Sequence, residues 1–214
     1  MGHKINPLGF RIGITEPHRS TWYAHGNAQY AAFVKQDYEL RTFLKTRFKS
    51  AAIEKIEIER KTDRTTITLH AGRPGVIIGK RGAEIDALTK SLEEKAGQPI
   101  KVNIQEVRKP DLSGQLVAEN VADQLERRGS FRRAMKRAIE NSMREGALGI
   151  KIKVSGRLGG NEIARTETEK AGSVSLNSLN KKIDYGYAVA NTQAGSIGVR
   201  VWINHGRYAD QKQD

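Results

Sequence analysis

Two adjacent cations stand between two glycines near the middle of the chain, a spacing suited to binding phosphate. The four residues are Gly79, Lys80, Arg81 and Gly82. Because glycine has no Cβ, the main chain of such a loop can approach a phosphodiester closely. A helical pattern begins at about Ala83, and the free N–H groups at a helix start carry partial positive charge. The spacing therefore predicts a phosphate-binding loop.

The segments on both sides of the loop predict the elements that would hold it. In chain order these are a helix over 38–48, two strands around a turn at 61–64, a short helix over 74–78, a helix from about 83 that Gly97 ends, and a strand over 100–105. This order resembles a KH domain of the second topological type, whose Gly-x-x-Gly loop holds a few nucleotides of single-stranded nucleic acid. The alternative is an ordinary turn between two core helices, but the loop, its cations and both flanks together favour the KH domain.

The charge balance of the chain indicates a polyanionic partner. The sequence has 37 Lys and Arg against 24 Asp and Glu, a formal net charge of +13 and a pI near 10.0. A folded chain of this charge binds nucleic acid or an anionic membrane surface. No apolar run approaches the roughly 18 residues of a membrane span, and the N-terminus lacks the apolar core of a signal peptide. We therefore expect nucleic acid as the partner and no membrane, and the absence of cysteine fits a cytoplasmic protein.

The chain is long enough for a second domain after Pro110. An apolar stripe over 112–125 predicts a helix that Gly129 ends, and Ser130 is a suitable N-cap for a second helix over 131–144. Strands are expected over 150–154, 183–190 and 197–203. The expected fold class is α+β with two domains: an N-terminal type II KH domain and a C-terminal domain of two helices on an antiparallel sheet.

The second of these helices begins within an unbroken run of cations. Between residues 127 and 137 there is no acid, and the six cations are Arg127, Arg128, Arg132, Arg133, Lys136 and Arg137. A helix face that only meets solvent normally mixes the two signs, whereas like charges four residues apart, such as Arg132 and Lys136, repel each other. Nearby phosphates would offset this repulsion, so we expect the face to contact RNA.

Several blocks of the sequence, in order and at the family's spacing, resemble bacterial small-subunit ribosomal protein three. They are residues 1–11, the Gly79–Gly82 loop, and residues 127–137, 154–160, 162–167, 183–185 and 198–203. The resemblance runs from Met1 to about Gly206. It departs from the commoner bacterial pattern over a loop at 168–175, where two aromatic residues are missing and Ser173 replaces an rRNA-facing arginine.

The resemblance implies a structural RNA-binding protein of the small ribosomal subunit head, located in the cytoplasm within the ribosome. Its expected partners are small-subunit rRNA, mRNA and the neighbouring small-subunit ribosomal proteins ten and fourteen. By position, Arg132, Arg133 and Lys136 would line the mRNA entry channel and passively help to open mRNA secondary structure. Gly79, Lys80, Arg81 and Gly82 would form the RNA-binding KH loop. Supporting RNA contacts are expected at Lys4, Arg11, Arg127, Arg128, Arg137, Arg144, Arg157 and Arg165.

The sequence favours neither an enzyme nor a cofactor-binding protein. Around the one Gly-Lys pair, a P-loop would need glycine in place of Pro74 and Ser or Thr in place of Arg81. The histidines lack metal-ligand spacing, so no metal is expected. The expected organisation is an rRNA-contacting extension over 1–16, the KH domain over 17–107, the C-terminal domain over 111–206 and a polar tail over 207–214. The alternative function is a free-standing KH-domain RNA-binding regulator.

Overall fold

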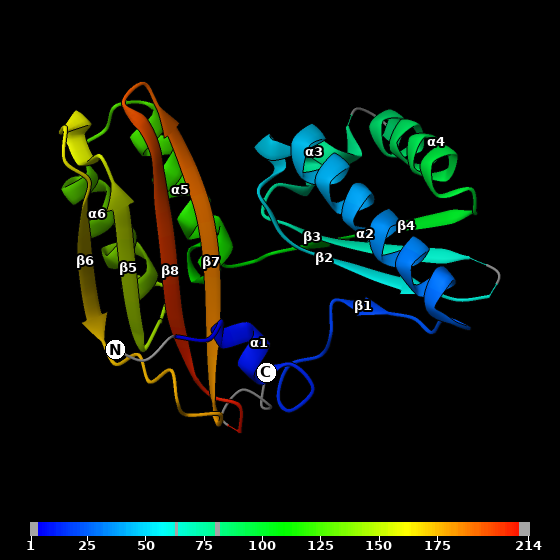
Figure 1. The fold of residues 1–214 in the computed structure, drawn as a ribbon, viewed down its shortest axis with the longest axis horizontal. Coiled ribbons are helices and arrows are strands. Elements are labelled where there is room, and N and C mark those ends of the chain that lie inside the picture. The colour runs from blue at the N-terminus through cyan, green and yellow to red at the C-terminus, as the bar shows by residue number, and fades with distance from the viewer. Residues whose placement is uncertain (1–3, 63, 80–81, 210–214) are drawn as a thin grey trace. The chain divides into compact units, whose positions relative to one another are not determined.

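The computed structural model describes residues 4–62, 64–79 and 82–209 (Figure 1). The chain forms two compact units, each with helices and a four-stranded sheet. One unit is His18–Arg108, and the other combines Met1–Pro17 with Lys109–Asp214. The last five residues of the predicted polar tail lie outside the described residues. No described helix has the length and apolar character that a membrane crossing requires.

The His18–Arg108 unit has the element order of a type II KH domain. Its elements are β1 (Ser20–Thr21), α2 (Asn27–Arg47), η1 (Lys49–Ala51), β2 (Ile53–Arg60), β3 (Thr65–Ala71), α3 (Pro74–Ile78), α4 (Ala83–Ala96) and β4 (Ile100–Glu106). The strands lie in the order β1-β2-β3-β4, with β2 antiparallel and β4 parallel to β3. Leu44 of α2 and Leu88 of α4 are buried in one core with Ile67 of β3, so both helices pack on one face of the sheet.

A buried carboxylate sets the start of this unit, which the sequence pattern does not reveal. Asp37 accepts hydrogen bonds from the Ser20 hydroxyl and the Trp22 indole, both at 2.9 Å. It also pairs with Arg60 of β2, whose guanidinium lies 2.5 Å from a carboxylate oxygen. The predicted helix over 38–48 starts too late: α2 begins at Asn27, and most side chains of its first turns are exposed rather than buried in the core.

The second unit places two helices on one face of an antiparallel sheet, as predicted. Its elements are α1 (Pro7–Arg11), η3 (Pro110–Leu112), α5 (Gly114–Glu126), α6 (Phe131–Arg144), β5 (Gly149–Gly156), η4 (Leu158–Gly160), β6 (Arg165–Gly172), β7 (Lys181–Thr192) and β8 (Gly195–Arg207). The strand order is β6-β5-β8-β7. Val121 of α5 and Met135 of α6 are buried against Ile152 of β5 and Val201 of β8. Figure 1 shows α1 on the other side of the sheet, beside β7.

The interpretation of residues 168–175 as a loop is wrong for most of that segment. Residues Arg165–Gly172 form β6, which pairs with β5 along its whole length, Thr168 lying opposite Lys153. The segment alternates threonine with charged residues and has no apolar side to mark it as a strand. An edge strand tolerates this composition because only one of its sides pairs with a neighbour.

Arg11, an expected rRNA contact, is buried inside the second unit rather than presented on its surface. Its side chain is 0% exposed and donates hydrogen bonds to four backbone carbonyls. The acceptors are Lys181 at 3.1 Å, Pro7 at 3.0 Å, Leu176 at 3.2 Å and Ser178 at 2.9 Å. The guanidinium therefore ties α1 to the start of β7 and the segment before it, and no phosphate can reach it. The described residues of the 1–16 segment group with the second unit.

We expect Arg11→Met to lower the free energy of unfolding by about 2–4 kcal/mol, measured by urea denaturation. The substitution keeps a long side chain but leaves four carbonyls without their donor. Arg207→Met, at an exposed position of the same unit, is the control and should stay within about 0.5 kcal/mol of the wild type. An equal effect of the two substitutions would contradict the structural role of Arg11.

Candidate nucleic-acid interface

The two glycines of the KH loop adopt the backbone conformation that a tight turn between two helices needs. Gly79 ends α3 with φ of 68°, and a Cβ there would lie 2.6 Å from Cγ of Glu84. Gly82, with φ of 82°, precedes α4, which begins at Ala83 without a side-chain cap. The first N–H groups of α4 therefore carry no side-chain acceptor from the N-cap. The predicted contacts Lys80 and Arg81 lie outside the described residues.

Helix α6 turns an apolar side to the sheet and a cationic side to solvent. Ala134 and Met135 are buried, and the exposed cations are Arg132, Arg133, Lys136 and Arg137. These four surround a shallow depression together with Ser130 and Glu140. Glu140 is an acid on the rim, three residues beyond the last cation of the run. Met143 is 37% exposed at the end of the helix.

The cations of α6 form no ion pair within the described part of the chain. Arg132 lies over the Phe131 ring, with 5.6 Å between its guanidinium carbon and the ring centroid, and none of the described ion pairs includes any of the four. Ser130 occupies the N-cap position, as predicted, but its side chain makes no capping hydrogen bond. Because like charges on one helix face repel, the arrangement favours a negatively charged ligand.

The turn before α6 places an arginine in an unusual backbone conformation. Helix α5 ends at Glu126, and Arg128 rather than Gly129 takes the left-handed position, with φ of 60°. The Gly129 N–H donates a hydrogen bond to the backbone carbonyl oxygen of Gln124 at 2.8 Å. A Cβ on Gly129 would lie 2.7 Å from this carbonyl oxygen. Glycine is therefore needed for close approach, while Arg128 carries the conformational strain. Its side chain reaches Gln193 at 2.8 Å.

Arg157 and Arg165, two of the expected RNA contacts, also interact with other residues of the second unit. Arg157 donates to the carbonyls of Asn161 at 2.8 Å and Ala194 at 2.9 Å, so it joins η4 to the β7–β8 turn. With Arg128 it lines a cavity of about 280 Å³. Arg165 is exposed, 3.7 Å from the Glu167 carboxylate and 5.7 Å from the Phe131 ring.

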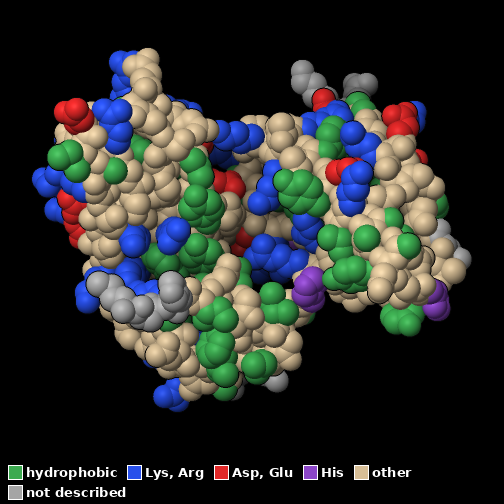
Figure 2. All heavy atoms as spheres, viewed as in Figure 1, with side chains coloured by type: hydrophobic (Ala, Val, Ile, Leu, Met, Phe, Trp, Pro, Cys, Tyr) green, Lys and Arg blue, Asp and Glu red, His purple; other side chains and the backbone are tan. Residues whose placement is uncertain are grey.

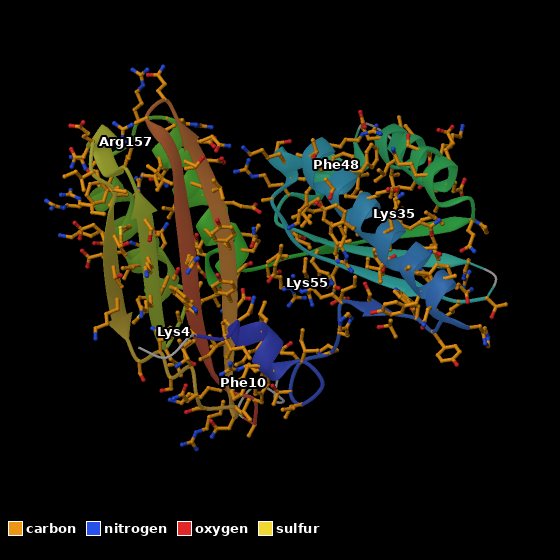
Figure 3. All side chains as sticks on the ribbon, in the orientation of Figure 1. Lys4, Phe10, Lys35, Phe48, Lys55 and Arg157 are labelled. Carbon is orange, nitrogen blue, oxygen red and sulfur yellow. The ribbon has the colours of Figure 1, made fainter. Side chains whose placement is uncertain are left out.

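The remaining supporting residues are scattered over the second unit. Arg127 and Arg144 are exposed at the C-terminal ends of α5 and α6. Lys4 is exposed in the N-terminal segment, and Figure 3 labels it together with Arg157, which follows β5. The structure therefore gathers Arg132, Arg133, Lys136 and Arg137 on one face. Arg165 shares the Phe131 ring with Arg132, and Arg157 holds backbone segments together.

Sequence reasoning missed a second group of cations in this unit. Lys151 and Lys153 of β5, Lys170 of β6 and Arg200 of β8 lie on the side of the sheet away from α5 and α6. The signal is the alternation over 150–154, where the apolar residues predict the strand and the two lysines between them must share its other side. Within the described residues, no group of three or more His, Asp or Glu could hold a metal ion.

Comparisons with known proteins agree with both halves of this architecture. A family model described as KH domain matches residues 39–112, and one described as Ribosomal protein S3, C-terminal domain, matches residues 121–203. Small ribosomal subunit protein uS3 of Chromohalobacter salexigens is 53% identical over 206 residues, which are 96% of this chain and 88% of the relative. The relative of the same name from Pseudomonas fluorescens Pf0-1 is 49% identical over 100% of this chain and 93% of its own length. The relative of the same name from Syntrophomonas wolfei is 50% identical over 206 residues, which are 96% of this chain and 90% of the relative. The chain thus belongs to the family of small ribosomal subunit protein uS3.

Proposed function

We propose that the protein is a structural component of the small ribosomal subunit head, which binds rRNA and lines the channel through which mRNA enters. The KH domain implies RNA binding, and membership of a ribosomal protein family implies that this RNA is rRNA within the ribosome. The relatives are named as ribosomal subunit proteins, and the protein is not an enzyme. The alternative of a free-standing KH regulator leaves the match over residues 121–203 unexplained.

The exposed cationic face of α6 is the observation that carries the proposed role at mRNA entry. Arg132, Arg133 and Lys136 project into solvent from a helix whose other side is anchored in the core. A fixed row of cations binds phosphates without selecting among bases, which suits a surface past which any message must move. The sequence lacks the glycine and hydroxyl residues of a P-loop, so the face would act passively, by holding single strands as a hairpin opens.

The KH loop and an apolar surface supply the other proposed contacts. Gly79 and Gly82 support a loop in which Lys80 and Arg81 would bind an RNA backbone. On α2, Tyr30, Val34 and Tyr38 are exposed four residues apart, so they form one apolar stripe. Such a stripe suits a protein neighbour, and the resemblance proposes ribosomal proteins ten and fourteen as the adjacent subunit proteins.

Sedimentation of a native cell extract through a sucrose gradient tests the proposed location. We expect the chain to migrate with small subunits and whole ribosomes and to remain there after a high-salt wash, because a subunit protein is held by many contacts at once. A protein bound only by its charge would be released by the wash, since salt weakens phosphate contacts steeply. Recovery near the top of the gradient would contradict the proposal and favour the free-standing regulator.

Ribosomes carrying Arg132→Ala, Arg133→Ala and Lys136→Ala should assemble normally but translate a message with a stable hairpin several-fold more slowly. The three substitutions remove exposed cations without touching the buried side of α6. Translation of an unstructured message should be unchanged. The control removes three exposed lysines of the KH unit, Lys35, Lys45 and Lys90, with the same loss of charge. Equal rates on the two messages in the α6 variant would refute the role at mRNA entry.

Lys80→Asp with Arg81→Asp should weaken binding of single-stranded RNA by the purified protein by about an order of magnitude. The slope of log affinity against log salt should fall by about 1–2, because two phosphate contacts are lost. Exchanging the two residues, Lys80→Arg with Arg81→Lys, keeps both charges and should keep the affinity. Unchanged affinity in the Asp variant, with unchanged circular dichroism, would exclude the loop as an RNA contact.

A further inference from the structure

The face of the second unit's sheet that lies away from α5 and α6 carries a compact group of cations. Side chains alternate between the two sides of a strand, so the buried Ile152 places its neighbours Lys151 and Lys153 on this outer face. The pairing register puts Lys151 directly opposite Lys170 of β6, and Lys153 directly opposite Arg200 of β8. Figure 2 shows Lys and Arg side chains on this side of the unit, beside a hydrophobic strip.

The acids of the described strand residues all fall on the opposite side of the sheet. Glu167 pairs with Val154, whose side chain is in the core, and Glu169 pairs with Ile152. Asp184 of β7 accepts a hydrogen bond from the Gly114 N–H of α5 at 2.6 Å. The outer face of the four strands therefore has cations and, in the described residues, no carboxylate to neutralise them.

This grouping works against the stability of the isolated protein. Like charges directly opposite each other on neighbouring strands are destabilising. Burial, followed by the positive charges of Lys4, Lys153 and Lys170, lowers the pKa of the Lys151 ammonium. Ring contacts, such as Lys151 on Trp202 at 5.5 Å, stabilise the cations but leave their charge in place. A bound polyanion would relieve the repulsion.

We propose that this outer face binds the phosphate backbone of rRNA, as a second RNA surface separate from the cationic face of α6. Tyr187 and Val189 are 47% and 41% exposed beside the cations and offer an apolar strip for a sugar or a base. Because α6 covers the other side of the same sheet, one unit would hold a fixed RNA on the sheet while mRNA passes α6. The inference rests on the proposed function, since the ribosome supplies both RNAs.

Binding of the purified full-length protein to a small-subunit rRNA transcript, measured over a range of KCl concentrations, tests the proposal. The variant Lys151→Gln, Lys153→Gln, Arg200→Gln should bind about tenfold more weakly at moderate salt, and its salt slope should fall by about 2–3. The matched variant Lys151→Arg, Lys153→Arg, Arg200→Lys keeps the charge and should keep both values. A wild-type slope and affinity in the Gln variant would overturn the proposal and leave the proposed function standing.

A second measurement avoids substitution. Lysine acetylation of the wild-type protein, with and without the transcript, should show protection of Lys151, Lys153 and Lys170 by RNA. Lys35, exposed on α2, should remain equally reactive in both samples. Equal acetylation of the three sheet lysines with and without bound RNA would overturn the proposal. Failure of the wild-type protein to bind the transcript at all would instead count against the proposed function, and with it this inference.

Discussion

Burial of one side of each amphipathic element decides where the cations of the second unit point. The hydrophobic effect favours burial of three apolar side chains, Met135 of α6 and Ile152 and Val154 of β5. Their burial fixes the rotation of α6 about its axis and the register of β5. A shift of one residue in β5 would turn Lys151 and Lys153 into the core, at a cost far above that of any surface interaction. The apolar core therefore does more than stabilise the unit, because it sets two rows of positive charge on opposite sides of one sheet.

The sequence predicts the KH unit well because its boundaries depend on local chemistry. Pro74 begins α3, Gly79 ends it, and Gly97 ends α4, each through its own backbone preferences. The features that the sequence did not predict involve residues that are distant from each other in the sequence. The buried Asp37 of α2 pairs with Arg60 of β2, and the buried Arg11 donates to carbonyls near residue 180. Residue type alone indicates surface exposure for both charges, so no local pattern reveals either contact.

The candidate interface was predictable to a similar extent. Helical spacing shows Arg132 and Lys136 on one face, and that face is exposed. The cations of the strands were not predicted to form a group. An apolar residue separates the two lysines of β5, and only pairing with β6 and β8 in the folded sheet brings these cations together. The left-handed backbone conformation of Arg128, in place of Gly129, was also not predicted, because neither composition nor spacing indicates a left-handed arginine.

The buried guanidinium of Arg11 also has a consequence for the order in which the chain can fold. Its acceptors at Leu176, Ser178 and Lys181 follow it by 165 to 170 residues. At about 5–20 residues per second, the ribosome synthesises them roughly 10–30 s after Arg11 itself. The His18–Arg108 unit is complete well before then and needs none of those residues for its core. Helix α1 is thus among the first segments made and among the last to find its place, and until then its arginine remains a free cation on the growing chain.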